Sequence, residues 1–307
     1  MVKRNKINYY SAFDLIIGSQ DINLPELKTE KKWDSIPDVE FLIKNKKNWI
    51  KDKSFSYEDD YLKISKDNLY LHIPEVADYY VSNGERIFIS PIKELNKNNN
   101  SYIKTYLLGS AIGALLIQRG RLLLHGNALE KEGEAIVCLG DSGVGKSTLA
   151  YLLMQKGWKL ISDDLVAIDN NGYTLPGIPR IKLWEDAVNF FNLEKKSLIQ
   201  VAKGFEKYTI SKNKLRISCS RTKVKKVFLL NRSFSQKNIE CKQIISEKEC
   251  FKSLINNYYR PLFVKYLLSE YSHFLLVNKL IKILPFYNIY LPNNLDCLSK
   301  NIEEYIF

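Results

Sequence analysis

A glycine-rich stretch, GDSGVGKS at 140–147, constrains this chain more than any other feature of its sequence. It matches the pattern GxxxxGK[ST], follows the apolar run EAIVCL and precedes an amphipathic run that begins at Thr148. A strand, a glycine-rich loop and a helix in this order distinguish a phosphate-binding loop from a chance match. The sequence therefore predicts a nucleotide-binding P-loop in an α/β domain.

Each residue type in such a loop has a physical task. Glycines let the backbone N–H groups turn toward phosphates, and the positive end of the helix dipole adds attraction. A lysine reaches the terminal phosphates and the serine hydroxyl ligates Mg²⁺. We expect ATP and Mg²⁺ to bind at Gly140, Asp141, Ser142, Gly143, Val144, Gly145, Lys146, Ser147 and Thr148.

Two adjacent acids, Asp163 and Asp164, end the expected strand WKLIS. Neighbouring strand residues point to opposite faces, so the two carboxylates should have different tasks. One could face Mg²⁺ and the terminal phosphate while the other accepts the proton of an acceptor hydroxyl. The sequence does not decide which is which, and a polar strand end without chemistry is the alternative.

His125 ends the apolar run RLLL fifteen residues before the loop. It could lie on a neighbouring strand that faces the same cleft. A lone histidine at a strand end is more often a structural hydrogen-bond partner, so this residue carries no function by itself.

Two domains are expected from the distribution of strand and helix signals. Residues 1–100 form a small β-rich domain, in which Asn83–Gly84 suits a type I′ hairpin because both residues need positive φ. After the polar run 96–100, the segment 104–120 reads as a buried helix stopped by Gly120. Residues 101–307 then form the P-loop domain.

The charge of the chain is +12 and is concentrated in one segment. Residues 194–232 hold twelve Lys or Arg against two acids, which could attract a nucleic acid, an anionic membrane or an acidic substrate, or could be a solvated face. No RNP-like pattern accompanies it, which disfavours a nucleotide-dependent RNA-binding module.

Cysteine spacing and hydropathy exclude other classes of protein. Five scattered cysteines have no spacing typical of a zinc site or a disulfide framework. The basic N-terminus is followed by no apolar segment, and the uncharged run 106–118 is too short to cross a bilayer. We expect a cytoplasmic protein.

Taken together, the run LLLHGNAL (122–129), the loop and the acidic pair in LISDDLVAID (160–169) resemble the catalytic domain of bacterial HPr kinase/phosphorylase. That family combines an HG-containing strand, a GDSGVGKS loop and an ADD-type pair at this spacing. It then carries a signature rich in Ile-Arg-Gly and Gly-Ile-Ile-Asp, tied to its phosphorylase reaction. This chain instead reads LPGIPRIKLWEDAV at 175–188.

The stretch 175–188, the opening YSAFDLIIGSQDINLPEL, the YYRPLF at 258–263 and the tail LPFYNIYLPNNLDCL are similar to a second group. These are HPr-kinase-related proteins encoded with peptide-modification genes. Among them are lasso-peptide precursor kinases, which phosphorylate the C-terminal serine of the precursor. We therefore expect a P-loop HPr-kinase-like catalytic domain, acting on a serine of a lasso-type precursor peptide.

The resemblance implies a role for each matching residue. Asp163 would be the general base, Lys146 part of the phosphate cradle, and Ser147 with Asp164 the metal side. His125 would be an active-site neighbour, and Arg180 falls where the family has its signature arginine. Arg260 is a weaker candidate of the same kind.

Other acceptors and partners remain open. The chain could be an authentic HPr(Ser) kinase/phosphorylase or a kinase of a free small-molecule hydroxyl. No nucleic-acid or membrane partner is expected. A homo-oligomer is an open option, because HPr kinase is a hexamer but the N-terminal region here does not look like that family's N-terminal domain.

Overall fold

The computed structural model of the chain describes residues 7–30, 35–46, 49–51, 53–93, 97–201, 206–233, 238–292 and 294–306. Contacts divide it into two compact units. The first unit is Met1–Leu123 with Tyr259–Leu276, and the second unit is Leu124–Tyr258 with Val277–Phe307. The expected domain boundary at residue 100 stays a prediction. The expected class, mixed α/β with a β-rich N-terminal region, is confirmed.

The first unit is built on one large sheet. Its described strands run in the order β3-β1-β2-β4-β9-β8-β7-β6-β5, and most neighbours are antiparallel. Side chains alternate between buried and partly exposed along β6, whereas β8 is buried at five consecutive residues, and Phe41, Ile64, Leu69 and Tyr79 have no exposed surface. The strands are β1 (Ile7–Ala12), β2 (Leu15–Gln20), β3 (Lys28–Glu30), β4 (Val39–Ile43), β5 (Tyr57–Glu58), β6 (Leu62–Ser65), β7 (Asn68–Ile73), β8 (Ala77–Ser82) and β9 (Arg86–Pro91).

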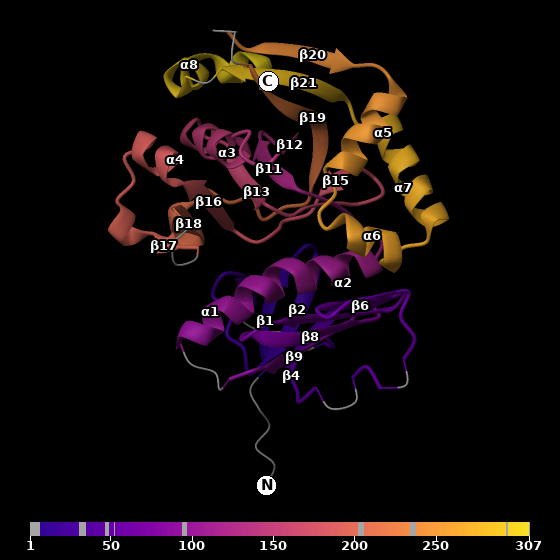
Figure 1. Cartoon of the computed structure of the whole chain (residues 1–307). Coiled ribbons are helices and arrows are strands. Elements are labelled where there is room, and N and C mark those ends of the chain that lie inside the picture. The colour runs from indigo at the N-terminus through magenta and orange to yellow at the C-terminus, as the bar shows by residue number, and fades with distance from the viewer. Residues whose placement is uncertain are drawn as a thin grey trace. The chain divides into compact units, whose positions relative to one another are not determined.

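A long helical segment packs on this sheet (Figure 1). It consists of α1 (Lys97–Tyr106), a π-helical turn (Leu107–Ala111) and α2 (Ile112–Gln118), and α2 contacts β8, β9 and the short helix α6 (Pro261–Leu267). The helix begins earlier than expected, so the polar run forms its first turn instead of a linker. Its end agrees with the sequence, because Gly120 has φ +70° beyond the last turn.

The β8–β9 hairpin confirms the turn expected at Asn83–Gly84. Both residues have positive φ, at 55° and 66°. The turn is also tied to the end of α2, since the Gly84 N–H donates to Gln118 Oε1 at 2.7 Å and the Arg119 guanidinium donates to the Gly84 carbonyl at 2.9 Å. A Cβ on Gly84 would lie 2.8 Å from Arg119 Cγ, so the contact itself requires glycine.

This contact generates a stability prediction. We expect Gly84→Ala to lower the free energy of unfolding by about 2 kcal/mol, because the left-handed backbone costs about 1 kcal/mol and the clash with Arg119 adds to it. The matched control is Gly120→Ala, which has the same left-handed strain but nothing within 4 Å of its Cβ. Equal losses for the two variants in urea unfolding would show that the hairpin–helix contact contributes nothing.

The second unit contains a mixed sheet that carries the glycine-rich loop. Its strands run β14-β15-β19-β12-β11-β13, and β21 extends it by pairing with β19 and β20. The strands of this sheet are β10 (Leu122–Leu124), β11 (Gly126–Lys131), β12 (Glu134–Leu139), β13 (Lys159–Asp163), β14 (Val166–Ile168), β15 (Tyr173–Thr174), β19 (Thr222–Ser233), β20 (Glu240–Ile244) and β21 (Phe286–Pro292).

The order of these strands differs from a simple βαβ unit. The two strands joined by the loop and its helix, β12 and β13, are not neighbours, because β11 lies between them and is antiparallel to both. Local patterns do not report this order, because it depends on pairing between separate strands. The segment RLLLHGNAL (121–129) breaks at His125, which lies between β10 and β11.

Helices cover this sheet, as Figure 1 shows for α3 (Lys146–Gln155), which packs on β11 and β13. Leu149 and Leu153 of α3 are fully buried, and a common core extends from them to α8 (Leu295–Ile306). A small sheet in the order β16-β18-β17 packs against α3 through β16. The remaining elements are α4 (Glu185–Phe190), α5 (Glu247–Asn256), α7 (Glu270–Ile283), β16 (Arg180–Trp184), β17 (Ile199–Gln200) and β18 (Lys207–Ser211). None of the described helices is long and apolar enough to cross a membrane.

Candidate active site

The glycine-rich loop connects β12 to α3 as the sequence predicts. Gly140, Gly143 and Gly145 have φ of +139°, +84° and +105°, values that side-chain-bearing residues rarely adopt. The Lys146 ammonium donates to the carbonyls of Gly140 and Asp141 at 2.6 and 2.9 Å. The loop backbone therefore surrounds the Lys146 side chain, and its glycines have the positive φ values that let backbone N–H groups turn toward a phosphate.

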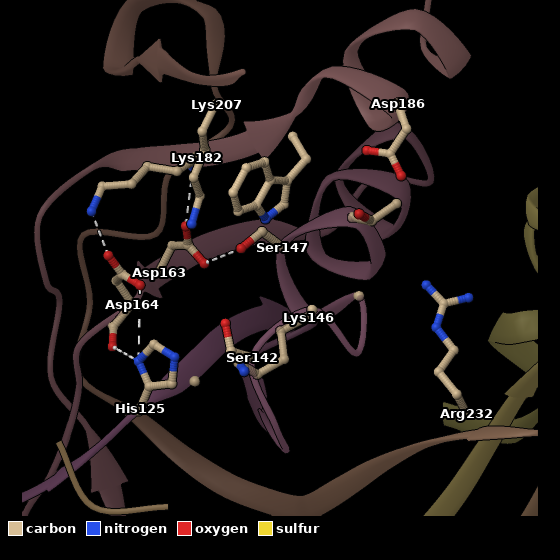
Figure 2. A pocket seen from close by; sticks show the side chains of 15 residues that line it. His125, Ser142, Lys146, Ser147, Asp163, Asp164, Lys182, Asp186, Lys207 and Arg232 are labelled. Atoms are coloured by element: carbon tan, nitrogen blue, oxygen red, sulfur yellow. Dashed lines mark hydrogen bonds and ion pairs between the residues drawn. The ribbon is translucent and has the colours of Figure 1, made fainter. Parts of the chain in front are cut away.

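A pocket opens over this loop, with most of its polar groups directed inward (Figure 2). It contains many of the predicted site residues, and it adds several that sequence reasoning did not select. The lining residues are His125, Gly126, Ser142, Gly143, Gly145, Lys146, Ser147, Thr148, Asp163, Asp164, Lys182, Trp184, Asp186, Lys207 and Arg232.

Asp163 lies at the centre of this arrangement, at the end of β13. Its carboxylate accepts a hydrogen bond from the Ser147 hydroxyl at 3.1 Å and one from the Lys182 backbone N–H at 3.1 Å. The residue is 7% exposed. Burial and the negative charge of Asp164 raise the pKa of Asp163 to about 6. It is thus a carboxylate that exchanges its proton close to neutral pH.

Asp164 lines the same pocket although strand alternation would send it to the opposite face. Its φ of +72° turns the chain out of the extended conformation immediately after β13, which ends the alternation. The Lys182 ammonium contacts the Asp164 carboxylate at 2.5 Å. Burial alone would raise the pKa of Asp164, but the charge and hydrogen bond of Lys182 lower it to about 2. The two neighbouring acids therefore have opposite shifts.

His125 lies beside the acidic pair, as the resemblance implied. Its backbone N–H donates to the Asn257 carbonyl at 2.7 Å, and its Nδ1 lies 3.2 Å from the Asp164 carbonyl oxygen. Burial and the nearby charge of Lys146 lower the pKa of His125, so the imidazole is mainly neutral at pH 7. The ring is 39% exposed and faces the pocket (Figure 2).

Two asparagines connect the loop to neighbouring elements through hydrogen bonds. Asn257 accepts a hydrogen bond from the Gly140 N–H at 2.9 Å, and Asn127 donates to the Lys146 carbonyl at 2.6 Å. Asn127 is fully buried and pairs in register with Asp163 across β11 and β13. The start of the loop and the start of α3 are thereby fixed to the sheet and to the end of α5.

Neither of the two predicted arginines lines this pocket. Arg180 begins β16 but is absent from the lining, and Lys182, two residues later on the same strand face, contacts the acidic pair instead. Arg260 belongs to the first unit, where its guanidinium donates to the Ser110 hydroxyl at 3.0 Å. The catalytic role of Arg180 stays a prediction.

Lys182 could have been found from the sequence. In RIKLW the apolar Ile181 and Leu183 are both buried, so alternation directs Lys182 and Trp184 to the other face. Lys207 and Arg232 had no such local signal, because β18 and β19 bring them to the loop from far along the chain.

The described side chains fit Mg²⁺ bound together with a nucleotide. The hydroxyl of Ser147 and the carboxylates of Asp163 and Asp164 are hard oxygen donors, which this ion prefers. Among the described residues, no cluster of three or more His, Cys, Asp or Glu side chains could hold a metal ion. Mg²⁺ commonly takes one or two protein carboxylates and completes its coordination shell with water and phosphate oxygens.

Comparison with known proteins places this site in a family context. Residues 119–229 match the family model of the HPr Serine kinase C-terminal domain. This segment is HPr kinase/phosphorylase-like.

Individual relatives agree with the family match. The HPr kinase/phosphorylase of Clostridium botulinum is 29% identical over 171 residues, 53% of this chain and 55% of the relative. That of Lactiplantibacillus plantarum is 26% identical over 178 residues, 55% of each. The chain thus spans about half the length of these relatives. The solved HPr(Ser) kinase/phosphatase of Coxiella burnetii aligns with a TM-score of 0.30 at 15% identity, over 60% of this chain and 95% of that one.

These matches correct one expectation from the sequence. The expected partner, a lasso-type precursor peptide, is wrong, because the family model and the matching curated relatives are named for HPr. The segments behind that expectation are short, and neither the tail nor YYRPLF contributes a residue to the pocket lining, whereas the stretch 175–188 does.

The raised pKa of Asp163 predicts an unusual effect on stability. The pKa of an aspartate is near 4 in an unfolded chain, and that of Asp163 is about 6 in the folded protein. The ionised carboxylate therefore lowers the free energy of unfolding at high pH, and this destabilisation disappears as the pH falls below both pKa values. Asp163→Asn should therefore stabilise the nucleotide-free protein at pH 8 by on the order of 2 kcal/mol. The gain should shrink by about half at pH 5.

Urea unfolding at both pH values measures this effect. The matched control is Asp164→Asn, which removes the ionised partner of Lys182 and should destabilise the protein at pH 8. A loss of stability in Asp163→Asn that does not depend on pH would show that Asp163 is a structural residue without a raised pKa.

Proposed function

We propose that this chain is an ATP-dependent kinase that phosphorylates a serine hydroxyl of a protein of the HPr type. The supporting observation is Asp163, a buried carboxylate with a pKa of about 6 that contacts Ser147 of the P-loop. A phosphate cradle alone would serve any nucleotide-binding protein. A proton acceptor at the terminal-phosphate end of that cradle supports transfer to a hydroxyl.

The proposed reaction follows from the positions of these groups. The acceptor oxygen forms a bond to the γ-phosphorus while the bond from that phosphorus to the bridging oxygen of ADP breaks. The hydroxyl proton goes to the Asp163 carboxylate, which is ionised above pH 6. The Lys146 ammonium and the loop N–H groups offset negative charge on the phosphates.

The remaining polar groups orient this apparatus. Lys182 keeps the Asp164 carboxylate ionised, and its backbone N–H holds Asp163. Mg²⁺, held by Ser147 with one of the two carboxylates, would neutralise charge on the phosphates. We assign Asp163 to the proton and Asp164 to the metal side, because the pKa of Asp163 is raised and that of Asp164 is lowered.

We propose that the protein transfers phosphate from ATP to the acceptor serine and does not catalyse the phosphorylase reaction of the resembled family. In the resembled family the phosphorylase reaction goes with a signature rich in glycine after the acidic pair. Here that stretch forms β16, with Lys182 and Trp184 at the pocket. Lys182 contacts the Asp164 carboxylate, and Trp184 lines the same pocket.

The acceptor side of the pocket is basic and aromatic. Lys207 lies over the Trp184 ring, with its ammonium 5.3 Å from the ring centroid, and both residues line the pocket. Trp184 is 47% exposed, more than its size would lead one to expect for a purely structural residue. The basic segment 194–232 continues from here through the exposed Lys214, whereas Lys203 lies outside the described residues. We propose that this rim attracts the acceptor protein.

The first functional prediction separates chemistry from binding. Asp163→Asn should lower kcat by roughly 10²–10⁴ with nearly unchanged ATP affinity, because the variant keeps the size but loses the base. Lys146→Ala should abolish transfer. The assay is mass spectrometry of HPr from the same organism after incubation with ATP and Mg²⁺.

Asp164→Asn is the matched control for this experiment. It should raise the Mg²⁺ requirement and weaken nucleotide binding together with the rate. An exchange of the two phenotypes would reverse our assignment of the acids. Parental transfer rates in both aspartate variants, or in Lys146→Ala, would remove the pocket from the mechanism.

A second prediction concerns the rim. Lys207→Glu should raise the KM for the acceptor about tenfold at low ionic strength, because it replaces attraction by repulsion, and added salt should reduce the difference between variant and parent. The control is Lys248→Glu, an exposed lysine of α5 that is absent from the pocket lining. An equal effect of both substitutions would mean that only the net charge of the protein matters.

A further inference from the structure

Arg232 is the only arginine among the described residues that line the pocket, and the reaction proposed above gives it no role. It lies near the end of β19, which is the parallel neighbour of β12, the strand that leads into the loop. Two strands that run side by side in the same direction deliver their ends to the same edge of the sheet. The position of Arg232 beside the loop is thus set by strand pairing.

The guanidinium of Arg232 is held in place by backbone carbonyls. Its Nε donates to the Val144 carbonyl at 2.9 Å, and Nη1 lies 3.4 Å from the Pro292 carbonyl. A side chain fixed by carbonyls loses little further entropy when it binds a ligand. The guanidinium is therefore oriented before any nucleotide arrives.

The third nitrogen of the group faces the loop. A Cβ built on Gly145 would lie 2.9 Å from Arg232 Nη2, closer than side-chain contacts allow. Glycine at this position thus serves two needs, because it also has a φ of +105°. Any other residue at 145 would displace the guanidinium from the place where α3 begins.

Within the described part of the chain, the charge of Arg232 has no acidic partner. No described carboxylate lies within ion-pair distance of its guanidinium, although the Lys182 ammonium in the same pocket is paired with Asp164. An arginine that lines a polar pocket with bonds only to neutral carbonyls retains its full charge and its remaining N–H donors. That combination is suited to an anion with several oxygen acceptors.

We propose that Arg232 binds the phosphates of the nucleotide on the leaving-group side, and this inference rests on the proposed kinase function. In P-loops the backbone around residues 143–145 cradles the α- and β-phosphates, and Arg232 touches the loop at Val144 and Gly145. Figure 2 shows Arg232 across the pocket from His125, Asp164 and Lys182, with Lys146 and Ser147 between.

This position gives Arg232 a defined part in the reaction. When the bond between the γ-phosphorus and the bridging oxygen breaks, its electron pair stays on the β-phosphate of ADP. The acceptor hydroxyl supplies the new oxygen–phosphorus bond and loses its proton to Asp163. Arg232 then stabilises the growing charge on ADP, while the acidic pair acts at the opposite end of the same transfer.

Binding of ADP without any acceptor tests the inference. We expect Arg232→Ala to weaken Mg·ADP binding by 10- to 100-fold in calorimetry, and Arg232→Lys to recover only part of it, because lysine lacks the planar fork of donors. AMP should bind both variants nearly as the parent does. The control is Lys225→Ala on the same strand, whose exposed ammonium pairs with Glu134.

A second measurement excludes a purely structural role for Arg232. Added guanidinium ion should partly restore the kcat of Arg232→Ala and should not affect Lys225→Ala. Parental ADP affinity in Arg232→Ala would overturn the inference and leave the proposed kinase intact. Equal weakening of ADP and AMP without guanidinium rescue would assign Arg232 to loop structure and also overturn it. A parent protein that binds no ADP would remove both proposals.

Discussion

The hydrogen bonds accepted by Asp163 connect the parts of the second unit that the site requires. One bond comes from Ser147 at the first turn of α3, and the other from the backbone of Lys182 in β16. Asp163 is the last residue of β13 and is paired in register with Asn127 of β11. A single buried side chain therefore links the first turn of α3 and the small sheet to the end of β13. The ionised form of Asp163 is costly in this environment, which is typical of groups retained for chemistry.

The electrostatics of the site depend on an asymmetry between neighbours. Asp164 is paired with Lys182 and stays ionised. Its negative charge, together with burial, raises the pKa of Asp163 to about 6. His125, mainly neutral, lies beside the pair and adds no competing charge. Pairs of titratable groups with pKa values pushed apart are the usual basis for assigning an acid and a base.

Local patterns in the sequence were sufficient for the loop and for several of its partners. The motif at 140–147 specified a strand, a loop and a helix because its glycines and lysine have a single common structural use. The Asn83–Gly84 turn and the stop at Gly120 were equally local. The acidic pair was found from its place at a strand end close to the loop and His125 only through the family resemblance, and the structure brings them together in one pocket.

The features that could not be predicted from the sequence depend on contacts between segments that are distant in the chain. The insertion of β11 between β12 and β13 depends on pairing between distant segments, and the left-handed φ of Asp164 broke the alternation rule at the residue where it mattered. Arg180 was selected by its place in a motif, but the pocket is lined by Lys182 because β16 begins outside it. The acceptor was misassigned because the similarities used for it are short, and only the segment 175–188 among them contributes side chains to the pocket lining.

The alternation of β16 has a consequence for how such a protein can change its substrate. Ile181 and Leu183 are buried and hold the strand in the core, whereas Lys182 and Trp184 project into the pocket. A substitution at 184 can thus alter the shape of the pocket while the buried face of the strand keeps its packing, whereas Lys182 is paired with Asp164 and is constrained by that contact. In the proposed kinase, the surface offered to an acceptor can therefore change at Trp184 without disturbing the core or the acidic pair.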